Sequence, residues 1–341
     1  MGWNVIERLD PNQPAPTLVW KDGSDRDFTS LNQITRKDGL KRAVLAKAFD
    51  VVLGLSAQPF EDRERKPVFD GPVEGLSQKR VIIHQIVAAD EYVVGLQVWI
   101  GGIDENPEPR PRTAGMLFTL NTFTVHNSRD TWMLRADSPE SFGTFEDSDQ
   151  FFNRVARFPA IGDVVDICSD APTRSQLSSR VTLIHDNAHL VNLQIVAKRV
   201  GDSVFGLGHD ITQWVKPQLD TITLMRSTGT VPTGRYTAVV AFRRTPDTEP
   251  ALVFWVTPPP PWLKYWDGTG PLERGQGGLI HPDDHHELIE ARTSLDAAKA
   301  VIVEKKVRLR SSDDSWIPVL LTLTNYPSQE TKLYIAEFAS Q

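Results

Sequence analysis

Cysteine is almost absent from this 341-residue sequence. The single one, Cys168, excludes an internal disulfide and a zinc site built from several cysteines. Uninterrupted apolar stretches long enough to cross a membrane are also missing. Residues 1–8 lack the basic start and the apolar run of a signal peptide. We therefore expect a cytoplasmic protein.

An excess of positive charge is missing as well. The sequence has 37 lysines and arginines against 44 aspartates and glutamates, a net charge of -7, and no basic stripe. Nucleic acid is consequently not an expected partner. The nucleophile elbow, the phosphate-binding loop and the protein-kinase motifs are absent, and no cofactor motif is evident. The sequence thus predicts a protein that is not an enzyme.

A threefold pattern of elements is the main feature that is present. Each third opens with a predicted strand, at residues 18–20, 132–134 and 252–256. A helix is predicted at residues 40–55, where apolar residues recur at spacings of three and four. Closing strands are predicted as hairpins at residues 80–100 and 190–211 and as a meander at residues 307–338.

Chain breakers separate the thirds. Residues 106–113 are rich in proline and arginine, and residues 213–250 contain prolines and glycines; both stretches suit boundaries. We therefore predict an α+β protein in which each domain is an antiparallel sheet with helices on one face. The predicted domains are residues 1–110, 111–215 and 216–341.

The C-terminal third resembles a PAS domain. Residues 280–284, which enter a predicted helix at 285–292, are similar to the helix-start segment of that family, and residues 307–316 with the meander are similar to its closing strands. The middle third ends in Asp210-Ile211-Thr212, like the tripeptide that often terminates a PAS domain. For the N-terminal and middle thirds the related GAF fold stays open.

Taken together, the chain resembles the stand-alone tandem PAS-GAF-PAS proteins of mycobacteria and other actinobacteria. The resemblance implies sheets that bind a small molecule or a protein partner. In the middle third we predict a pocket with an apolar wall, in which the helical side contributes Phe152, Val155, Val164 and Ile167 and the strands contribute Leu193, Ile195, Phe205 and Leu207.

A second group of residues has the chemistry of metal ligands: His281, Asp283, Asp284, His285 and His286. The same residues also fit a helix start, because Pro282 suits a first turn and aspartates favour the positive end of a helix. We expect Asp283 or Asp284 to cap the helix, and we expect no metal.

Two functions remain open from the sequence. One is a non-enzymatic sensory or signalling protein whose output lies in another protein, because three sensor-like units occupy the whole chain. The other is a structural scaffold or protein-interaction adaptor whose pockets are filled by side chains. Large residues such as Trp316 favour filled pockets, whereas Gly206 and Gly208 favour open ones.

Overall fold

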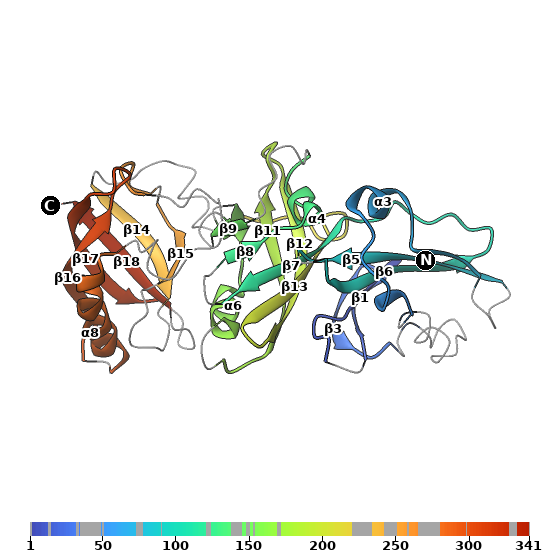
Figure 1. Ribbon diagram of the computed structural model, residues 1–341, viewed down its shortest axis with the longest axis horizontal. Helices are drawn as coiled ribbons and strands as arrows, with labels where there is room; N and C mark the ends of the chain where they lie inside the picture. Colours follow the sequence, from blue (N-terminus) through green and yellow to red (C-terminus); the bar gives the residue numbers. More distant parts are fainter. Residues whose placement is uncertain are drawn as a thin grey trace. The chain divides into compact units, whose positions relative to one another are not determined.

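The contacts in the computed structural model divide the chain into two compact units, and Figure 1 shows the elements of both. The first unit consists of Met1–Phe118, His126–Thr144 and Gln176–Pro217. The second consists of Thr119–Val125, Phe145–Ser175 and Gln218–Gln341. The structure describes residues 2–12, 15–31, 34, 49, 51–72, 78–89, 91–120, 124–137, 145–147, 151–152, 154–168, 172–219, 234–241, 251–257, 259–264, 280–297, 299–326 and 333–340.

A six-stranded antiparallel sheet, the N-terminal sheet, has the strand order β3-β2-β1-β6-β5-β4. Its strands are β1 (Trp3–Glu7), β2 (Thr17–Lys21), β3 (Ser24–Thr29), β4 (Phe69–Pro72), β5 (Lys79–Val87) and β6 (Val93–Gly102). Almost every residue of β5 and β6 is buried. A strand buried on both faces needs a cover on each face. One apolar cluster contains Ile83 and Val98, and a separate one contains Ile86 and Val94.

The first unit also holds four neighbouring strands of a seven-stranded sheet, which we call the middle sheet. In spatial order they are β11, β12, β13 and nearly all of β7. These strands are β7 (Thr113–Thr119), β11 (Gln176–Ile184), β12 (Leu190–Val200) and β13 (Ser203–Asp210). The other elements nearby in sequence are α3 (Phe60–Arg65), β8 (Thr124–His126), α4 (Arg129–Met133), β9 (Phe145–Asp147), β10 (Val155–Arg157) and α6 (Ile161–Ile167).

Both predicted hairpins are confirmed. Strands β5 and β6 pair antiparallel, as do β12 and β13, whose pairing ends where Val200 lies opposite Ser203. The predicted helix at residues 40–55 lies mostly outside the described residues. Its described part is residue 49 and residues 51–55, of which 49 and 51–53 are helical. Val52 and Leu53 are buried in the cluster that contains Ile83, whereas Val51 and Leu55, which were predicted to face a sheet, are exposed.

The predicted strand at residues 132–134 is wrong, because Trp132 and Met133 lie in helix α4. A reciprocal capping box starts this helix. The backbone N–H of Thr131 donates to Ser128 Oγ at 3.1 Å, and the backbone N–H of Ser128 donates to Thr131 Oγ1 at 3.4 Å. These bonds satisfy backbone donors at the helix start, so they outweigh the β preference of the apolar residues that follow.

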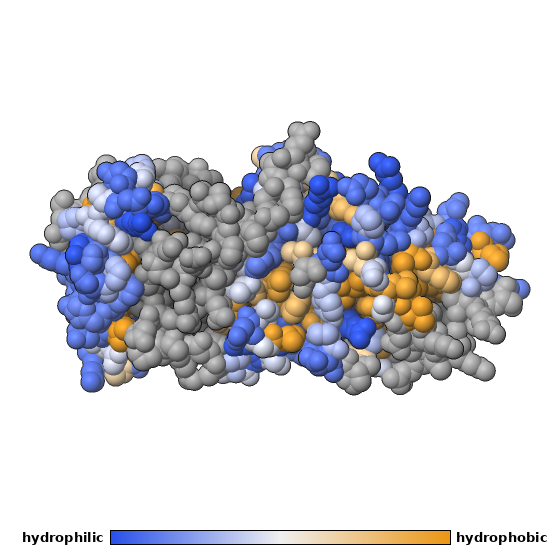
Figure 2. Space-filling view, in the orientation of Figure 1, coloured by the Kyte–Doolittle hydropathy of each residue, from blue (hydrophilic) through white to orange (hydrophobic). Residues whose placement is uncertain are grey.

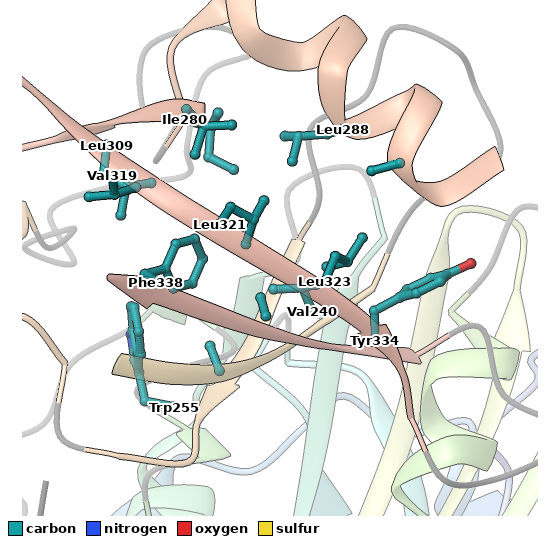
Figure 3. Close-up of a cluster of buried hydrophobic side chains, with 14 of the residues drawn as sticks. Val240, Trp255, Ile280, Leu288, Leu309, Val319, Leu321, Leu323, Tyr334 and Phe338 are labelled. Atoms are coloured by element: carbon teal, nitrogen blue, oxygen red, sulfur yellow. The ribbon is translucent and has the colours of Figure 1, made fainter. Parts of the chain in front are cut away.

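The second unit contains a five-stranded antiparallel sheet, the C-terminal sheet, with the order β15-β14-β18-β17-β16. Its elements are β14 (Arg235–Ala241), β15 (Ala251–Trp255), the 3-10 helix η2 (Pro282–Asp284), α8 (His285–Asp296), β16 (Ile302–Arg310), β17 (Trp316–Asn325) and β18 (Leu333–Ser340). The predicted meander and the helix at 285–292 are confirmed. Figure 3 shows Leu288 of α8 facing the side chains of the sheet, among them Leu321, Tyr334 and Phe338.

Candidate functional site

The two sheets of the first unit contact each other through an apolar cluster that we call the junction. The buried members are contributed by β1, β2, β5 and β6 of the N-terminal sheet, by β12 and β13 of the middle sheet, and by adjoining residues: Val5, Leu9, Val19, Trp20, Ile86, Ala88, Val94, Val196, Leu207 and Ile211. Phe28, Tyr92, Phe205, Trp214 and Val215 pack around them. Because burial of apolar surface is the main stabilising term in folding, the two sheets stabilise each other.

Two glycines allow this close approach. A Cβ atom at Gly95 of β6 would lie 2.9 Å from Leu207 Cδ1 of β13. A Cβ atom at Gly115 of β7 would lie 2.6 Å from the backbone nitrogen of Ala88. The Gly115 contact is with backbone, so β7 approaches the end of β5 this closely only because residue 115 lacks a side chain. At Gly95 the nearest atom is the carbonyl oxygen of Ile6 on β1, so that glycine also serves the pairing within the N-terminal sheet.

A buried ion pair joins the two sheets inside the junction. Lys198 Nζ of β12 lies 2.8 Å from Glu7 Oε1 of β1, and the two side chains are 5% and 1% exposed. The backbone N–H of Leu9 donates to Glu7 Oε2 at 2.9 Å, and Thr17 Oγ1 donates to Glu7 Oε1. Lys198 Nζ also lies 4.8 Å from the centre of the Phe28 ring. Several partners therefore offset the loss of water around these two charges.

A second buried polar group in the junction lacks such partners. His209 of β13 has no exposed surface, and neither ring nitrogen has a hydrogen-bond partner among the described residues. Its ring contacts Trp20 at 5.0 Å in an edge-on arrangement and Trp214 at 5.9 Å. Burial lowers the pKa of His209 to about 3. The imidazole is therefore neutral at physiological pH.

Two further unpaired polar atoms belong to residues around His209. Gln194 lies directly opposite it on β12. The Gln194 Nε2–H donates to the carbonyl of Val19 at 2.8 Å, but Gln194 Oε1 and Trp20 Nε1 have no partner in the described part of the chain. We call His209, Gln194 and Trp20 the polar cluster. Each unpaired buried group costs about 1–3 kcal/mol of stability.

Charged contacts also join the short helices of the first unit. Arg63 of α3 lies 2.6 Å from Asp130 of α4, and Arg129 of α4 lies 2.7 Å from Glu61 of α3. His84 of β5 is buried beneath α3 and donates from Nδ1 to the carbonyl of Arg63 at 3.3 Å. Burial lowers its pKa to about 4, and the charge of Arg110 acts in the same direction.

The segment 106–113, which the sequence suggested as a boundary, is anchored to the N-terminal sheet. The Trp3 Nε1–H donates to the carbonyl of Glu108 at 2.9 Å. The Gln97 Nε2–H donates to the carbonyl of Pro111 at 2.8 Å. Arg110 in turn donates to Gln97 Oε1 at 3.2 Å. The prolines here direct the chain across the sheet and do not free it from the fold.

The residues predicted to line a pocket do not share one surface on the strands. Ile195 of β12 is opposite Gly208 of β13, and directly opposed residues point to the same side of a sheet. Leu193 and Ile195 therefore lie on the face that carries Gly208. Phe205 and Leu207 alternate with this glycine, so they lie on the other face and contribute to the junction.

The four residues predicted from the helical side lie in the second unit. Phe152 and Ile167 are buried, whereas Val155 and Val164 are half-buried. Val164 and Ile167 belong to helix α6, but Val155 lies in strand β10. Their helical spacing therefore did not reflect one continuous helix.

The two glycines that suggested an open pocket face other side chains. A Cβ atom at Gly208 would lie 3.1 Å from Leu134 Cδ1, and one at Gly206 would lie 3.5 Å from Met116. The space left by the missing side chains is thus lined closely by Leu134 and Met116. Leu193 Cδ1 also lies 3.9 Å from the Gly208 position.

The histidine and aspartate group of the C-terminal third serves structural contacts. His281 Nδ1 accepts from the backbone N–H of Asp283 at 3.2 Å and so caps η2. Asp284 makes no capping bond to α8, so its predicted role is wrong. Its carboxylate instead accepts from the backbone N–H of Arg308 at 2.7 Å and from the guanidinium at 2.6 and 3.0 Å. These charge-assisted bonds lower the pKa of Asp284 and are stronger than a neutral cap.

In the ranges that the structure describes, no group of three histidine, cysteine, aspartate or glutamate residues is arranged to hold a metal ion. None of the helices described has both the length and the apolar character needed to span a membrane.

Sequence reasoning missed the ion pair and the polar cluster. Lys198, Gln194 and His209 occupy inward positions of two strands that also carry Val196, Leu207 and Phe205 on that face. A polar residue at such a position is the signal that would have found them. Glu7, the partner of Lys198, lies 191 positions away from it, and no local pattern predicts that contact.

Comparisons with known proteins give a fold but no family. No family model matches the chain, and no curated protein matches it. An uncharacterized protein from Mycobacterium tuberculosis has a similar structure, with a TM-score of 0.72, 17% identity, and coverage of 100% of this chain and 96% of the other. An RNA-binding Light-Oxygen-Voltage receptor reaches a TM-score of only 0.26 at 10% identity, over 67% of this chain and 95% of its own. The chain is therefore similar in fold, over its whole length, to a mycobacterial protein whose function is unassigned.

Proposed function

We propose that this chain is a non-enzymatic cytoplasmic sensory protein. It binds a small molecule or a protein partner through PAS- or GAF-like domains and passes the signal to another protein. The small-molecule surface is the face of β12 and β13 that carries Leu193 and Ile195, because the opposite face is occupied by the junction.

The polar cluster of the junction is the observation that carries this proposal. A passive contact between two sheets gains stability when unpaired buried groups are replaced by apolar ones of the same shape. The closed junction therefore lies closer in free energy to an opened state than its apolar area suggests. A sensory protein needs such a second state, because a ligand acts by shifting the balance between two states.

A protein partner is supported by the surface of the first unit. Apolar side chains reach the surface over this unit in the view of Figure 2. Its exposed large hydrophobic residues include Val51 at 58%, Leu55 at 47% and Ile103 at 50%. The negative net charge does not favour nucleic acid.

A scaffold is the second candidate function, and the filled cores favour it. In the C-terminal sheet Trp255, Tyr334 and Phe338 are almost completely buried in the core cluster that also contains Leu288 of α8 (Figure 3). Leu134 and Met116 similarly line the glycine positions of β13. On this alternative the chain serves only as a rigid arrangement of surfaces for other proteins.

A ligand test separates the two candidates. Purified full-length protein is denatured, and the small molecules released are identified by mass spectrometry. The native protein is then screened by thermal shift and small-angle scattering against lipids, nucleotides, haem and flavins. A ligand at a hundred times its Kd stabilises the protein by about 2.7 kcal/mol.

Gly206→Leu and Gly206→Ala provide the matched pair for this screen. The alanine Cβ fits at 3.5 Å from Met116, whereas the longer leucine occupies the proposed surface. The leucine variant should lose the response and the alanine variant should keep it. If no molecule co-purifies and no compound shifts either signal, the scaffold replaces the sensor.

A further inference from the structure

The segment that follows β13, residues 211–215, folds back over the polar cluster, and we call it the strap. Ile211 is fully buried in the junction, and the backbone N–H groups of Trp214 and Val215 both donate to its carbonyl at 2.9 Å. Asn192 holds the start of the strap, since its backbone carbonyl accepts from Ile211 at 2.8 Å and its backbone N–H donates to Thr212 Oγ1 at 2.9 Å. The strap is thus one short turn fixed to β12 at its first two residues.

The far end of the strap is held by one indole ring and by the Asn192 Nδ2–H, which donates to the carbonyl of Val215 at 3.3 Å. Trp214 contacts Trp20 at 5.1 Å and His209 at 5.9 Å. Its Cδ1 lies 2.9 Å from the position where a Cβ atom of Gly23 would be. Gly23 has a φ of +78°, so this turn both requires glycine and leaves room for the indole. Ring contacts of this kind are individually weak.

The strap also occupies a distinctive place along the chain. The first unit ends at Pro217, and the second unit continues from Gln218. Only two residues separate the strap from that point. A displacement of Trp214 therefore acts directly on the segment that leads into the second unit.

We propose that the strap is a releasable latch. In a minor state of the native protein, Trp214 detaches from Trp20 and His209, and water then reaches the polar cluster. In the closed state the ring nitrogens of His209, Gln194 Oε1 and Trp20 Nε1 are buried without partners. After release, water can hydrogen-bond to each of these buried polar atoms, and this gain offsets the lost ring contacts. The remainder of the junction stays closed, because Ile211 and Thr212 keep their bonds to Asn192 and the Glu7–Lys198 pair does not involve the strap.

Protonation of His209 should favour release, because a charged imidazole needs water. The charged residues on the elements around this ring are Lys198 and Arg199 on β12, Asp210 on β13, and Lys21 and Asp22 on and after β2. Arg199 alternates with Lys198 and so lies on the other face of the sheet. Lys198 is paired with Glu7. Asp210 alternates with His209 and so points to the other face, where its Oδ1 accepts from the backbone N–H of Thr212 at 2.9 Å. In the closed state, burial away from water is what lowers the pKa of His209.

Hydrogen exchange of the full-length protein, followed by mass spectrometry, tests the latch. In the wild type, amides of residues 212–215 should exchange at least about tenfold faster than those in the centre of β12, after correction for intrinsic rates. His209→Phe should slow strap exchange by roughly tenfold, because the apolar ring removes the gain from hydration. Lowering the pH from about 7 to about 5 should accelerate strap exchange in the wild type but not in this variant.

Gln194→Leu is the second variant, in case His209→Phe does not fold, and it should slow strap exchange in the same direction. The latch is refuted if the strap and β12 exchange at one common rate in the wild type, or if neither variant changes strap exchange. This outcome is independent of the ligand screen, so the sensory function and the latch fail or stand separately.

Discussion

Glu7 and Lys198 allow a test at the scale of single residues. Lys198→Met leaves the Glu7 carboxylate buried with only its hydrogen bonds, and we expect a loss of about 3–5 kcal/mol in the free energy of unfolding. The double variant Glu7→Gln/Lys198→Met removes both charges and should recover more than half of that loss. Urea unfolding of the three proteins measures these values. A single variant as stable as the wild type would show that the pair contributes no net stability.

The buried histidines predict how the stability of the first unit depends on pH. The folded pKa values of His209 and His84 are about 3 and about 4, against an ordinary value of 6.5. Below pH 6.5 the unfolded chain binds protons that the folded chain does not, so the free energy of unfolding falls as the pH decreases toward those values. Each histidine contributes a slope of up to about 1.4 kcal/mol per pH unit.

His209→Phe should remove one of these two contributions. Urea titrations at several pH values between about 6 and 4.5 should then give a smaller loss of stability for the variant than for the wild type. His209→Phe should also be at least as stable as the wild type at neutral pH, because the polar cluster loses its most costly member. Parallel pH profiles for the two proteins would contradict the assignment of His209.

The contacts of single residues were the least predictable part of the structure. The sequence indicates that Lys198 lies on a buried strand, but its partner is near the N-terminus and belongs to another sheet. Periodicity reports which face of an element is apolar and says nothing about which distant element covers that face. The same limit applies to Asp284, whose partner Arg308 lies on β16.

At the scale of elements, the glycines of the junction predict which strands tolerate a side chain. Gly115→Ala places a methyl group 2.6 Å from a backbone nitrogen that cannot move without shifting β5, so we expect a loss of about 1–3 kcal/mol. Gly206→Ala is the matched control, because its nearest neighbours lie at ordinary contact distances. Thermal unfolding compares the two. Equal melting temperatures would contradict a close approach of β7 to β5.

The start of α8 offers a second element-scale test. Asp284→Ala breaks three bonds to Arg308, and we expect a loss of about 1–3 kcal/mol. Asp283→Ala should cost much less, because that side chain is 76% exposed. Because the folded pKa of Asp284 is lowered, its contribution is present above the ordinary carboxylate range and is lost as the pH falls through the folded value. A larger effect of Asp283→Ala would restore the capping interpretation.

Elements with long apolar alternation were predicted well, whereas register and short helices were not. The hairpins at β5–β6 and β12–β13 were found because each combines two apolar runs with a short turn. The predicted pocket combined residues from the two opposite faces of the middle sheet. The reason is that a two-residue turn places an odd-numbered residue of β12 opposite an even-numbered one of β13. Helix α4 was missed because its signal is a pair of capping hydroxyls rather than a periodic face.

At the scale of the whole molecule, the N-terminal and middle sheets of the first unit should unfold together. Ile83→Ala removes a fully buried side chain on the face of β5 that points away from the junction, which typically costs about 2–5 kcal/mol. We expect hydrogen-exchange protection to fall in β12 and β13 as well as in β5 and β6. Val307→Ala, in the core of the second unit, is the control and should leave the first unit protected. Loss of protection confined to β5 and β6 would show that the sheets unfold separately.

The composition and the repeated hairpins predicted the α+β class and three sheets, because both depend on local pattern alone. The proposed division at residues 110 and 215 stays a prediction. The two compact units instead follow contacts that no local pattern encodes, since the junction joins residues of the first and second predicted domains. Breakers in the sequence mark turns of the chain, and a turn need not be the edge of an independent core.

The double cover of the N-terminal sheet has a practical consequence for dissecting the protein. A fragment of residues 1–110 keeps the cluster around Ile83 but loses Val196, Leu207 and Trp214 from the other face. Its β1, β2, β5 and β6 would then present a broad apolar surface and an unpaired Glu7 to solvent. Such surfaces promote self-association and recovery as insoluble material. A fragment that ends after the strap, near residue 217, keeps the junction residues together and is the fragment to express.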